Sequence, residues 1–295
     1  MHPAPSVIAF TVLSGMGFGL LAFLGAGLPA PVGWPAFFHW GLGYSLAVGG
    51  LLASTFHLGN PQRFLRAFTQ WRSSWLSREA IASVACLLAL APVALSDWLG
   101  LGWPRALGLI GAVLALATIF CTAMIYAQLK TIPRWNHPTT PALFVVFAGA
   151  GGAILAGQSG AGLMLSALLA LVLLAAFSIG DGAFAARAQT LGTATGLGTI
   201  GPVQGAVRVF EQPHTSPNYL MREMIYLVAR KHIRPLRRLA LICAAILPAV
   251  LLAILPPAPW AFAVIAAVHL LGAFAARWLF FAQAEHVVGL YYGQR

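Results

Sequence analysis

Two ionisable side chains stand at the two ends of one polar segment, FHLGNPQRFLRAFTQWRSSWLSREAI, that joins two long apolar runs. His57 follows the first run, and Glu79 stands where the second run begins. An imidazole and a carboxylate at the ends of consecutive helices can hold a hydroxyl group and remove its proton. Oxidation of a quinol needs a hydrogen-bond partner for each oxygen and a base for the proton. We therefore take His57 and Glu79 as candidate catalytic and quinone-binding residues.

Three further charged residues lie at the ends of apolar runs: Arg78, Asp181 and Arg277. Ionisable groups inside membrane segments are costly and by default mark function, so we predict that these three also line the quinone pocket. Two alternatives stay open. An arginine at a span end often reaches lipid phosphate, which is the interpretation we favour for Arg187. An aspartate among glycines, as in the segment 178–182, can simply hydrogen-bond neighbouring helices.

The composition indicates an integral membrane protein. Of 295 residues, 60% are hydrophobic and only 8% are charged, whereas a soluble domain has about 25% charged residues. The formal net charge of +11 suggests basic residues flanking membrane spans better than it suggests a nucleic-acid partner. Three cysteines lie in apolar runs without a CxxC partner, which argues against a disulfide scaffold, a zinc site or a protein-ligated iron–sulfur cluster.

The pattern of apolar runs predicts an all-α membrane protein with eight transmembrane helices in one bundle, a single domain over residues 1–295. A span needs about 20 apolar residues. The connections after the second, fourth and sixth spans are long or polar, and the longest covers 187–236. The expected spans are 6–28, 36–56, 79–99, 104–129, 140–157, 161–186, 237–255 and 257–282.

The basic residues predict the orientation. With this threading, 16 of the 17 Lys and Arg residues fall on one side, and only Arg105 falls opposite. Positively charged connections stay in the cytoplasm, so we expect both termini there. All the candidate site residues then lie at the cytoplasmic end, where they can line one cavity.

Haem and transport are the other functions to weigh. Eight histidines are present, but only His269 lies well inside a span, and no pair lies at matched depth, so we expect no haem. Secondary transporters place polar groups near the bilayer midplane and carry internal repeats. Here the charges gather at one edge and no repeat is evident. A purely structural anchor is a third alternative.

The cytoplasmic connections predict a docking surface. The segments 57–78 and 130–139 are basic and aromatic, and they can form one platform for a soluble partner or for membrane lipid. In the longest connection, Ser216 followed by Pro217 predicts the start of a helix that runs to about His232.

Several segments resemble the membrane anchor subunits of the dimethyl sulfoxide reductase family, which include the anchors of membrane-bound sulfite-oxidising molybdoenzyme complexes. The family pattern HLG-x-P followed by S-W-L-S-R-E is matched at 57–61 and 74–79. MIYAQLKTIPRWNHP at 124–138 and the stretch SPNYLMREM to ARKH at 216–232 are similar as well. The resemblance covers the whole chain, including the number of spans.

The resemblance implies an oxidoreductase subunit that has no cofactor of its own and exchanges electrons with membrane quinone, either ubiquinone or menaquinone. Its partner is an iron–sulfur subunit, expected to dock on 57–78, 130–139 and 187–236. Through that subunit it reaches a catalytic subunit that carries molybdopterin. The histidine and glutamate that the family uses for quinol match His57 and Glu79, whereas Asp181 and Arg277 rest on their position alone.

Orientation separates two branches of the family. Soluble subunits in the cytoplasm favour a sulfite:quinone oxidoreductase in the bacterial inner membrane. The alternative is a dimethyl sulfoxide reductase anchor that oxidises menaquinol, and a haem b anchor or a secondary transporter is disfavoured.

Overall fold

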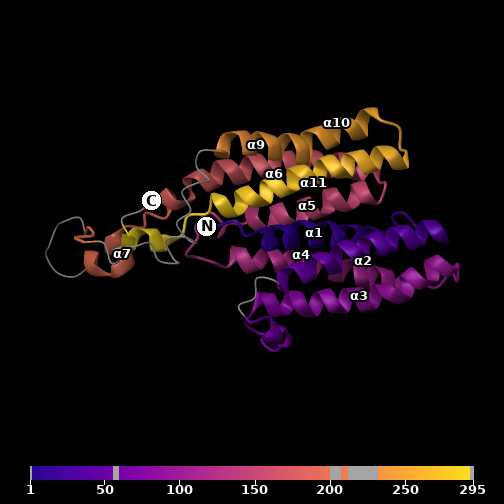
Figure 1. The fold of residues 1–295 in the computed structure, drawn as a ribbon, viewed down its shortest axis with the longest axis horizontal. Coiled ribbons are helices and arrows are strands. Elements are labelled where there is room, and N and C mark those ends of the chain that lie inside the picture. The colour runs from indigo at the N-terminus through magenta and orange to yellow at the C-terminus, as the bar shows by residue number, and fades with distance from the viewer. Residues whose placement is uncertain (1, 56–59, 200–206, 212–231, 293–295) are drawn as a thin grey trace.

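A bundle of long helices forms the body of the computed structural model, which describes residues 2–55, 60–199, 207–211 and 232–292 (Figure 1). Short helical turns, η1 (Pro61–Phe68), α7 (Leu191–Thr195), η2 (Leu197–Thr199) and η5 (Val287–Tyr292), lie outside it. The bundle contains α1 (Pro5–Gly25), α2 (Trp34–Thr55), α3 (Trp75–Leu99), α4 (Ala106–Ala127), α5 (Thr139–Leu155), α6 (Ser159–Ala186) and α11 (Pro259–Ala282). It also contains one continuous helix made of α9 (Ile233–Leu241), η4 (Ile242–Ile246) and α10 (Leu247–Ile254).

Helix α1 lies at the centre and packs against α2, α4, α5 and α11 (Figure 1). Glycines allow this close packing. A Cβ atom on Gly19 would lie 2.0 Å from the carbonyl oxygen of Ala148 in α5, and one on Gly152 would lie 2.3 Å from the Gly19 backbone. Small residues at such contacts are how membrane helices bring their backbones together, because lipid supplies no hydrophobic drive between helices.

Seven of the described helices are long and apolar enough to cross a membrane, with Ile233–Ile254 counted as one helix through α9, η4 and α10. The helix α5 has 17 residues and is shorter than these seven. The crossing expected at 140–157 therefore stays a prediction, while the multi-pass all-helical class is confirmed.

Helix α3 begins at Trp75, four residues before the expected start of the third span. The cause is Ser74, whose hydroxyl oxygen accepts a hydrogen bond from the Ser77 backbone N–H at 3.4 Å and so caps the helix. Glu79 consequently lies in the second turn of the helix and not at its edge.

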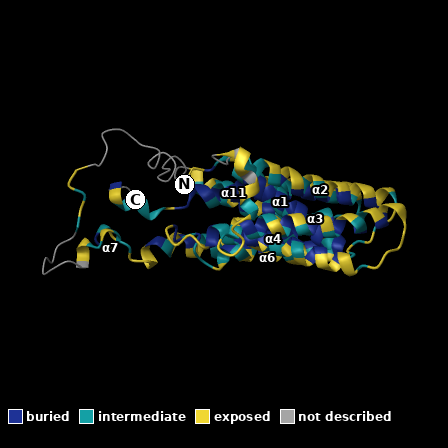
Figure 2. Ribbon diagram, turned by 90° about the horizontal axis from the view of Figure 1, so that it is seen from below, coloured by how far each residue is buried: buried dark blue, intermediate teal, exposed yellow. Residues whose placement is uncertain are grey.

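Exposed residues run along the outside of the bundle (Figure 2), and many of them are large apolar side chains. Leu88, Val113, Met164 and Leu171 expose between 65% and 69% of their surface. A soluble monomer does not expose a continuous apolar belt of this kind, so this surface faces lipid. The start of α1 and the end of α11 lie at the same end of the bundle (Figure 1).

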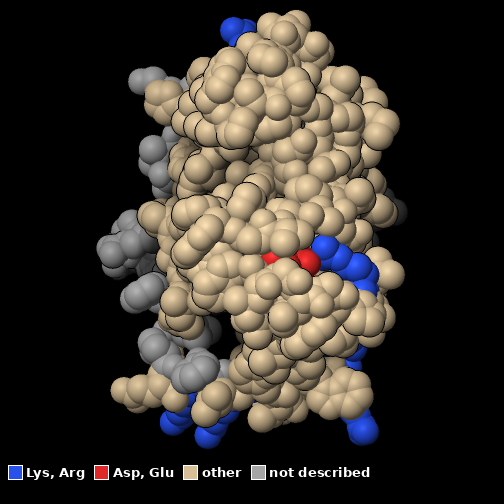
Figure 3. Space-filling model, turned by 90° about the vertical axis from the view of Figure 1, so that its right-hand side faces the viewer, with Lys and Arg blue, Asp and Glu red and all other residues tan. Residues whose placement is uncertain are grey.

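The opposite end of the bundle is almost free of charge (Figure 3). Its ion pair joins Arg105, just before α4, to Asp97 near the end of α3, with Nη1 and Oδ2 3.0 Å apart. The same carboxylate oxygen accepts a hydrogen bond from the indole N–H of Trp40 in α2 at 3.0 Å. The cluster fastens α2, α3 and α4 together at this end.

Candidate functional site

Glu79 is buried between α3 and α4, with 3% of its surface exposed. The hydroxyl of Thr122 in α4 donates a hydrogen bond to Glu79 Oε1. The same hydroxyl lies 3.0 Å from the backbone carbonyl of Thr118, one turn earlier in α4. No ion pair of Glu79 occurs within the described ranges, so this carboxyl group has a neutral partner in an apolar surrounding.

Arg277 is buried in α11, with 3% of its surface exposed. Its guanidinium carbon lies 3.5 Å from the centre of the Phe144 ring and 5.3 Å from that of Phe147, both in α5. Its Nη1 has no hydrogen-bond partner in the part of the chain that the structure describes. The aromatic faces stabilise this buried cation in place of an acid.

A small cavity lies between Arg277 and Thr122, the hydrogen-bond partner of Glu79. It is lined by Thr122 and Ile119 of α4, Phe144, Arg277 and three residues of α1, Thr11, Ser14 and Gly15. A second cavity shares Thr11, Gly15 and Arg277 and continues to His269. The structure therefore gathers Glu79, Thr122, Arg277 and His269 along one buried polar line against α1.

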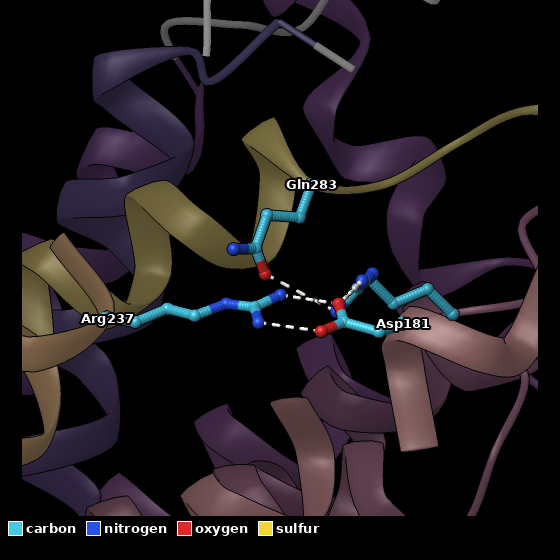
Figure 4. A network of polar contacts seen from close by, with 4 residues as sticks. Asp181, Arg237 and Gln283 are labelled. Carbon is cyan, nitrogen blue, oxygen red and sulfur yellow. Dashed lines mark hydrogen bonds and ion pairs between the residues drawn. The ribbon is translucent and has the colours of Figure 1, made fainter. Parts of the chain in front are cut away.

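Asp181 lies outside this line. Its carboxylate accepts two hydrogen bonds from Arg237 of α9, at 2.7 and 2.5 Å, and one from Arg134 Nη2 at 2.6 Å. The side-chain amide of Gln283, directly after α11, lies 3.3 Å from Arg134 Nη1 (Figure 4), and with its oxygen and nitrogen exchanged it accepts from Arg237 Nε at 2.9 Å. We call Arg134, Asp181, Arg237 and Gln283 the arginine clasp, because it joins α6, α9, the end of α11 and the α4–α5 connection.

The sequence around Asp181 explains how the clasp forms. A Cβ atom on Gly180 would lie 2.4 Å from Arg134 Nη1, so a larger residue there would displace that guanidinium from α6. Burial lowers the pKa of Arg134, and its hydrogen bond with Asp181 opposes that shift. Of the two interpretations of Asp181, hydrogen bonding to neighbouring elements is therefore the one that matches its contacts.

Arg78 also points away from the buried line. Its Nε donates to the Trp71 carbonyl at 2.9 Å and its Nη2 to the Arg72 carbonyl at 2.7 Å, while the guanidinium lies over the Trp75 ring at 4.3 Å. Arg78 therefore orders the connection before α3. Of the predicted pocket residues, Arg277 lines a cavity that Thr122, the hydrogen-bond partner of Glu79, also lines, whereas Arg78 and Asp181 lie elsewhere.

Two predictions fall outside the described residues. His57 lies in the segment 56–59, and the helix expected from Pro217 to about His232 lies mainly in 212–231. The pairing of His57 with Glu79 and the amphipathic helix remain predictions.

Residues 2–282 match the family described as DMSO reductase anchor subunit. This chain belongs to that family. It is also similar to a protein described as a subunit of sulfite dehydrogenase in Allochromatium vinosum, with 31% identity over 334 aligned positions that cover 99% of each chain. No solved structure matches it. The resemblance drawn from the sequence motifs is thereby confirmed: the chain is a multi-pass membrane anchor subunit of a molybdoenzyme complex.

The aromatic residue Trp135 in the expected docking segment 130–139 is not available at the surface. It is 2% exposed. Its ring stacks on Phe280 with the centroids 5.0 Å apart, and its N–H donates to the Phe280 carbonyl at 2.9 Å. Arg134 next to it turns inward to the clasp. Within the described part of the platform, Trp71 does expose 53% of its surface.

Three features were not predicted from the sequence: the hydrogen bond between Thr122 and Glu79, the pairing of Arg134 with Asp181, and the cluster around Asp97. A signal existed for Thr122, because Thr118 and Thr122 are four residues apart in an otherwise apolar run and so share one helix face. For Arg134 no local signal existed, since its partner is 47 positions away.

Proposed function

We propose that this anchor subunit transfers electrons from the iron–sulfur subunit of a sulfite-oxidising molybdoenzyme complex to membrane quinone. The quinone reacts beside Glu79. The observation that carries the proposal is the buried Glu79 carboxyl group, held by a neutral hydroxyl near the end of the bundle where the basic connections gather. The similarity to a protein named as part of a sulfite dehydrogenase supports the choice of sulfite.

Reduction of a quinone to a quinol consumes two electrons and two protons. The electrons come from clusters in the partner, because the anchor's cysteines show none of the motifs that hold a cluster. Glu79 hydrogen-bonds the quinone oxygen, delivers a proton and takes up another. His57, at the end of the preceding helix, holds the second oxygen. Arg277 adds a positive charge at the cavity that Thr122, the partner of Glu79, also lines.

The side of the membrane on which the partner subunits dock distinguishes the sulfite-oxidising branch of the family from the dimethyl sulfoxide reductase branch. All basic residues except Arg105 are expected at the Glu79 end, and the positive-inside rule assigns that end to the cytoplasm of a bacterial inner membrane. Partner subunits docked there act on cytoplasmic sulfite. The competing function is that of a dimethyl sulfoxide reductase anchor, in which the same site oxidises menaquinol; the family description supports this second candidate.

The branch is tested with the purified complex. We expect sulfite-dependent reduction of a soluble quinone analogue. Activity restricted to quinol-dependent reduction of dimethyl sulfoxide would overturn the sulfite assignment.

The site is tested with Glu79→Gln, which keeps the shape of the side chain and removes the base. We expect quinone turnover to fall by about 100-fold, with assembly intact. The control Glu285→Gln alters an exposed acid beyond α11 and leaves turnover unchanged. Unchanged turnover in Glu79→Gln would instead favour a structural anchor.

A further inference from the structure

Thr122 is placed between two hydrogen-bond acceptors. Its Oγ1 lies within hydrogen-bonding distance of Glu79 Oε1 and, at 3.0 Å, of the Thr118 carbonyl oxygen. A hydroxyl group has one proton to donate and two lone pairs with which to accept. Thr122 can therefore donate to only one of these oxygens at a time, and which one it serves depends on the proton of Glu79.

Both protonation states of Glu79 find a complete set of partners in this geometry. When Glu79 is ionised, the Thr122 hydroxyl donates to the carboxylate. When Glu79 is protonated, its O–H donates to the Thr122 oxygen and the Thr122 hydroxyl turns to the Thr118 carbonyl. Neither state leaves the carboxyl group unpaired in an apolar core, which would be destabilising. No repacking of α3 against α4 is needed.

Thr122 also faces the cavity beside α1, where a water molecule has suitable partners. Thr11 donates to the Val7 carbonyl at 3.0 Å and Ser14 to the Phe10 carbonyl at 2.6 Å, so both hydroxyl oxygens are left to accept. Arg277, which lines the same cavity, has an unpartnered Nη1 among the described residues. Buried waters need two to four polar partners, and this cavity supplies them.

We propose that Thr122 is a positioning residue for Glu79 and relays its proton to and from a water in this cavity. In uptake, a protonated water gives one proton to the Thr122 oxygen while the original hydroxyl proton passes to Glu79. One O–H bond forms and one breaks on Thr122, and a single proton is transferred without electrons. The positive charge of Arg277 disfavours a proton resting on the water in the cavity.

The inference rests on the proposed function, because it assigns the proton route of the same site. The other titratable groups that face Glu79 are Cys121 and Tyr126 of α4, with Arg277 of α11 across the cavity. Neither Cys121 nor Tyr126 is hydrogen-bonded to Glu79 among the described contacts, which leaves Thr122 as its direct partner.

The test compares Thr122→Val, which removes the hydroxyl at nearly constant volume, with Thr122→Ser, which keeps it. The matched control is Thr118→Val, which removes a buried hydroxyl one turn away and leaves the Thr118 carbonyl in place. In the purified complex we expect Thr122→Val to lower kcat about tenfold and to shift its pH profile, with KM for quinone little changed. Thr122→Ser and Thr118→Val should behave like the wild type.

A second readout separates this inference from the proposed function. Infrared difference spectra report the carboxyl C=O band of protonated Glu79, identified by its absence in Glu79→Gln. We expect Thr122→Val to shift that band. If Thr122→Val keeps both the wild-type band and pH profile while Glu79→Gln is inactive, the relay is wrong and the site stands. If Glu79→Gln is fully active, the site itself is wrong. Thr122→Ala carries the same readouts if the valine variant fails to assemble.

Discussion

The imidazole Nδ1 of His269 lies 2.8 Å from the carbonyl oxygen of Ala244. In a regular α-helix that carbonyl accepts from the N–H of residue 248, but residue 248 is proline and has no N–H. The chain forms the π-helical segment Ile242–Ile246 just before it, and α11 passes close by at Gly272. Because a carbonyl can only accept, Nδ1 carries a proton and donates it to this oxygen.

This relationship predicts a stability effect. His269→Leu leaves the Ala244 carbonyl without a donor inside the bundle, so we expect the free energy of unfolding to fall by about 1–3 kcal/mol. His269→Asn can present an amide N–H to the same carbonyl and should lose less. Thermal unfolding of the purified protein in detergent measures both variants. Equal losses would show that the hydrogen bond contributes nothing beyond packing.

The arginine clasp predicts a different signature for Asp181→Asn. This change leaves Arg134 and Arg237 close together without their shared carboxylate, so we expect a lower midpoint of thermal unfolding that recovers partly in high salt. Arg237→Gln keeps the Arg134–Asp181 pair and should cost less. A midpoint for Asp181→Asn equal to that of the wild type at low salt would contradict a role for the clasp in stability.

The contact between α1 and α5 predicts intolerance at Gly19. Gly19→Ala places a methyl group 2.0 Å from the Ala148 carbonyl oxygen, so the helices must separate, which costs about 1–3 kcal/mol or more. Gly41→Ala in α2 meets no atom within 4 Å and is the matched control. Yield and monodispersity in detergent should fall for Gly19→Ala alone; similar behaviour of the two variants would refute the close packing.

The cluster of Trp40, Asp97 and Arg105 at the other end of the bundle predicts an effect on stability without an effect on activity. Asp97→Asn removes the shared partner of Trp40 and Arg105, so we expect a lower midpoint of thermal unfolding. Turnover per assembled complex should stay at the wild-type level, because the cluster lies at the end of α3 away from Glu79. A loss of turnover in well-assembled complex would place this end in the reaction.

The hydropathy of the chain predicted the helices well, because bilayer thickness sets the length of a span and leaves little freedom. The bounds differ mainly where a local cap intervenes: Ser74 starts α3 a turn early. That Glu79 stands at the start of an apolar run followed from the sequence, whereas its burial goes with the Ser74 cap, which places it in the second turn of α3. Its partner did not follow, since Thr122 is 43 positions away and reaches it only through the rotation of α4 against α3.

The sequence by itself determined the membrane class, the family and the residue types available for proton transfer, because these depend on apolar length and on local motifs. Only the tertiary structure decided which polar groups meet: Arg277 shares a cavity with Thr122, Asp181 binds two arginines, and Trp135 turns inward. The physical reason is that these meetings depend on helix rotation and separation. Both are set by backbone contacts such as the one at Gly19, which apolar periodicity does not encode.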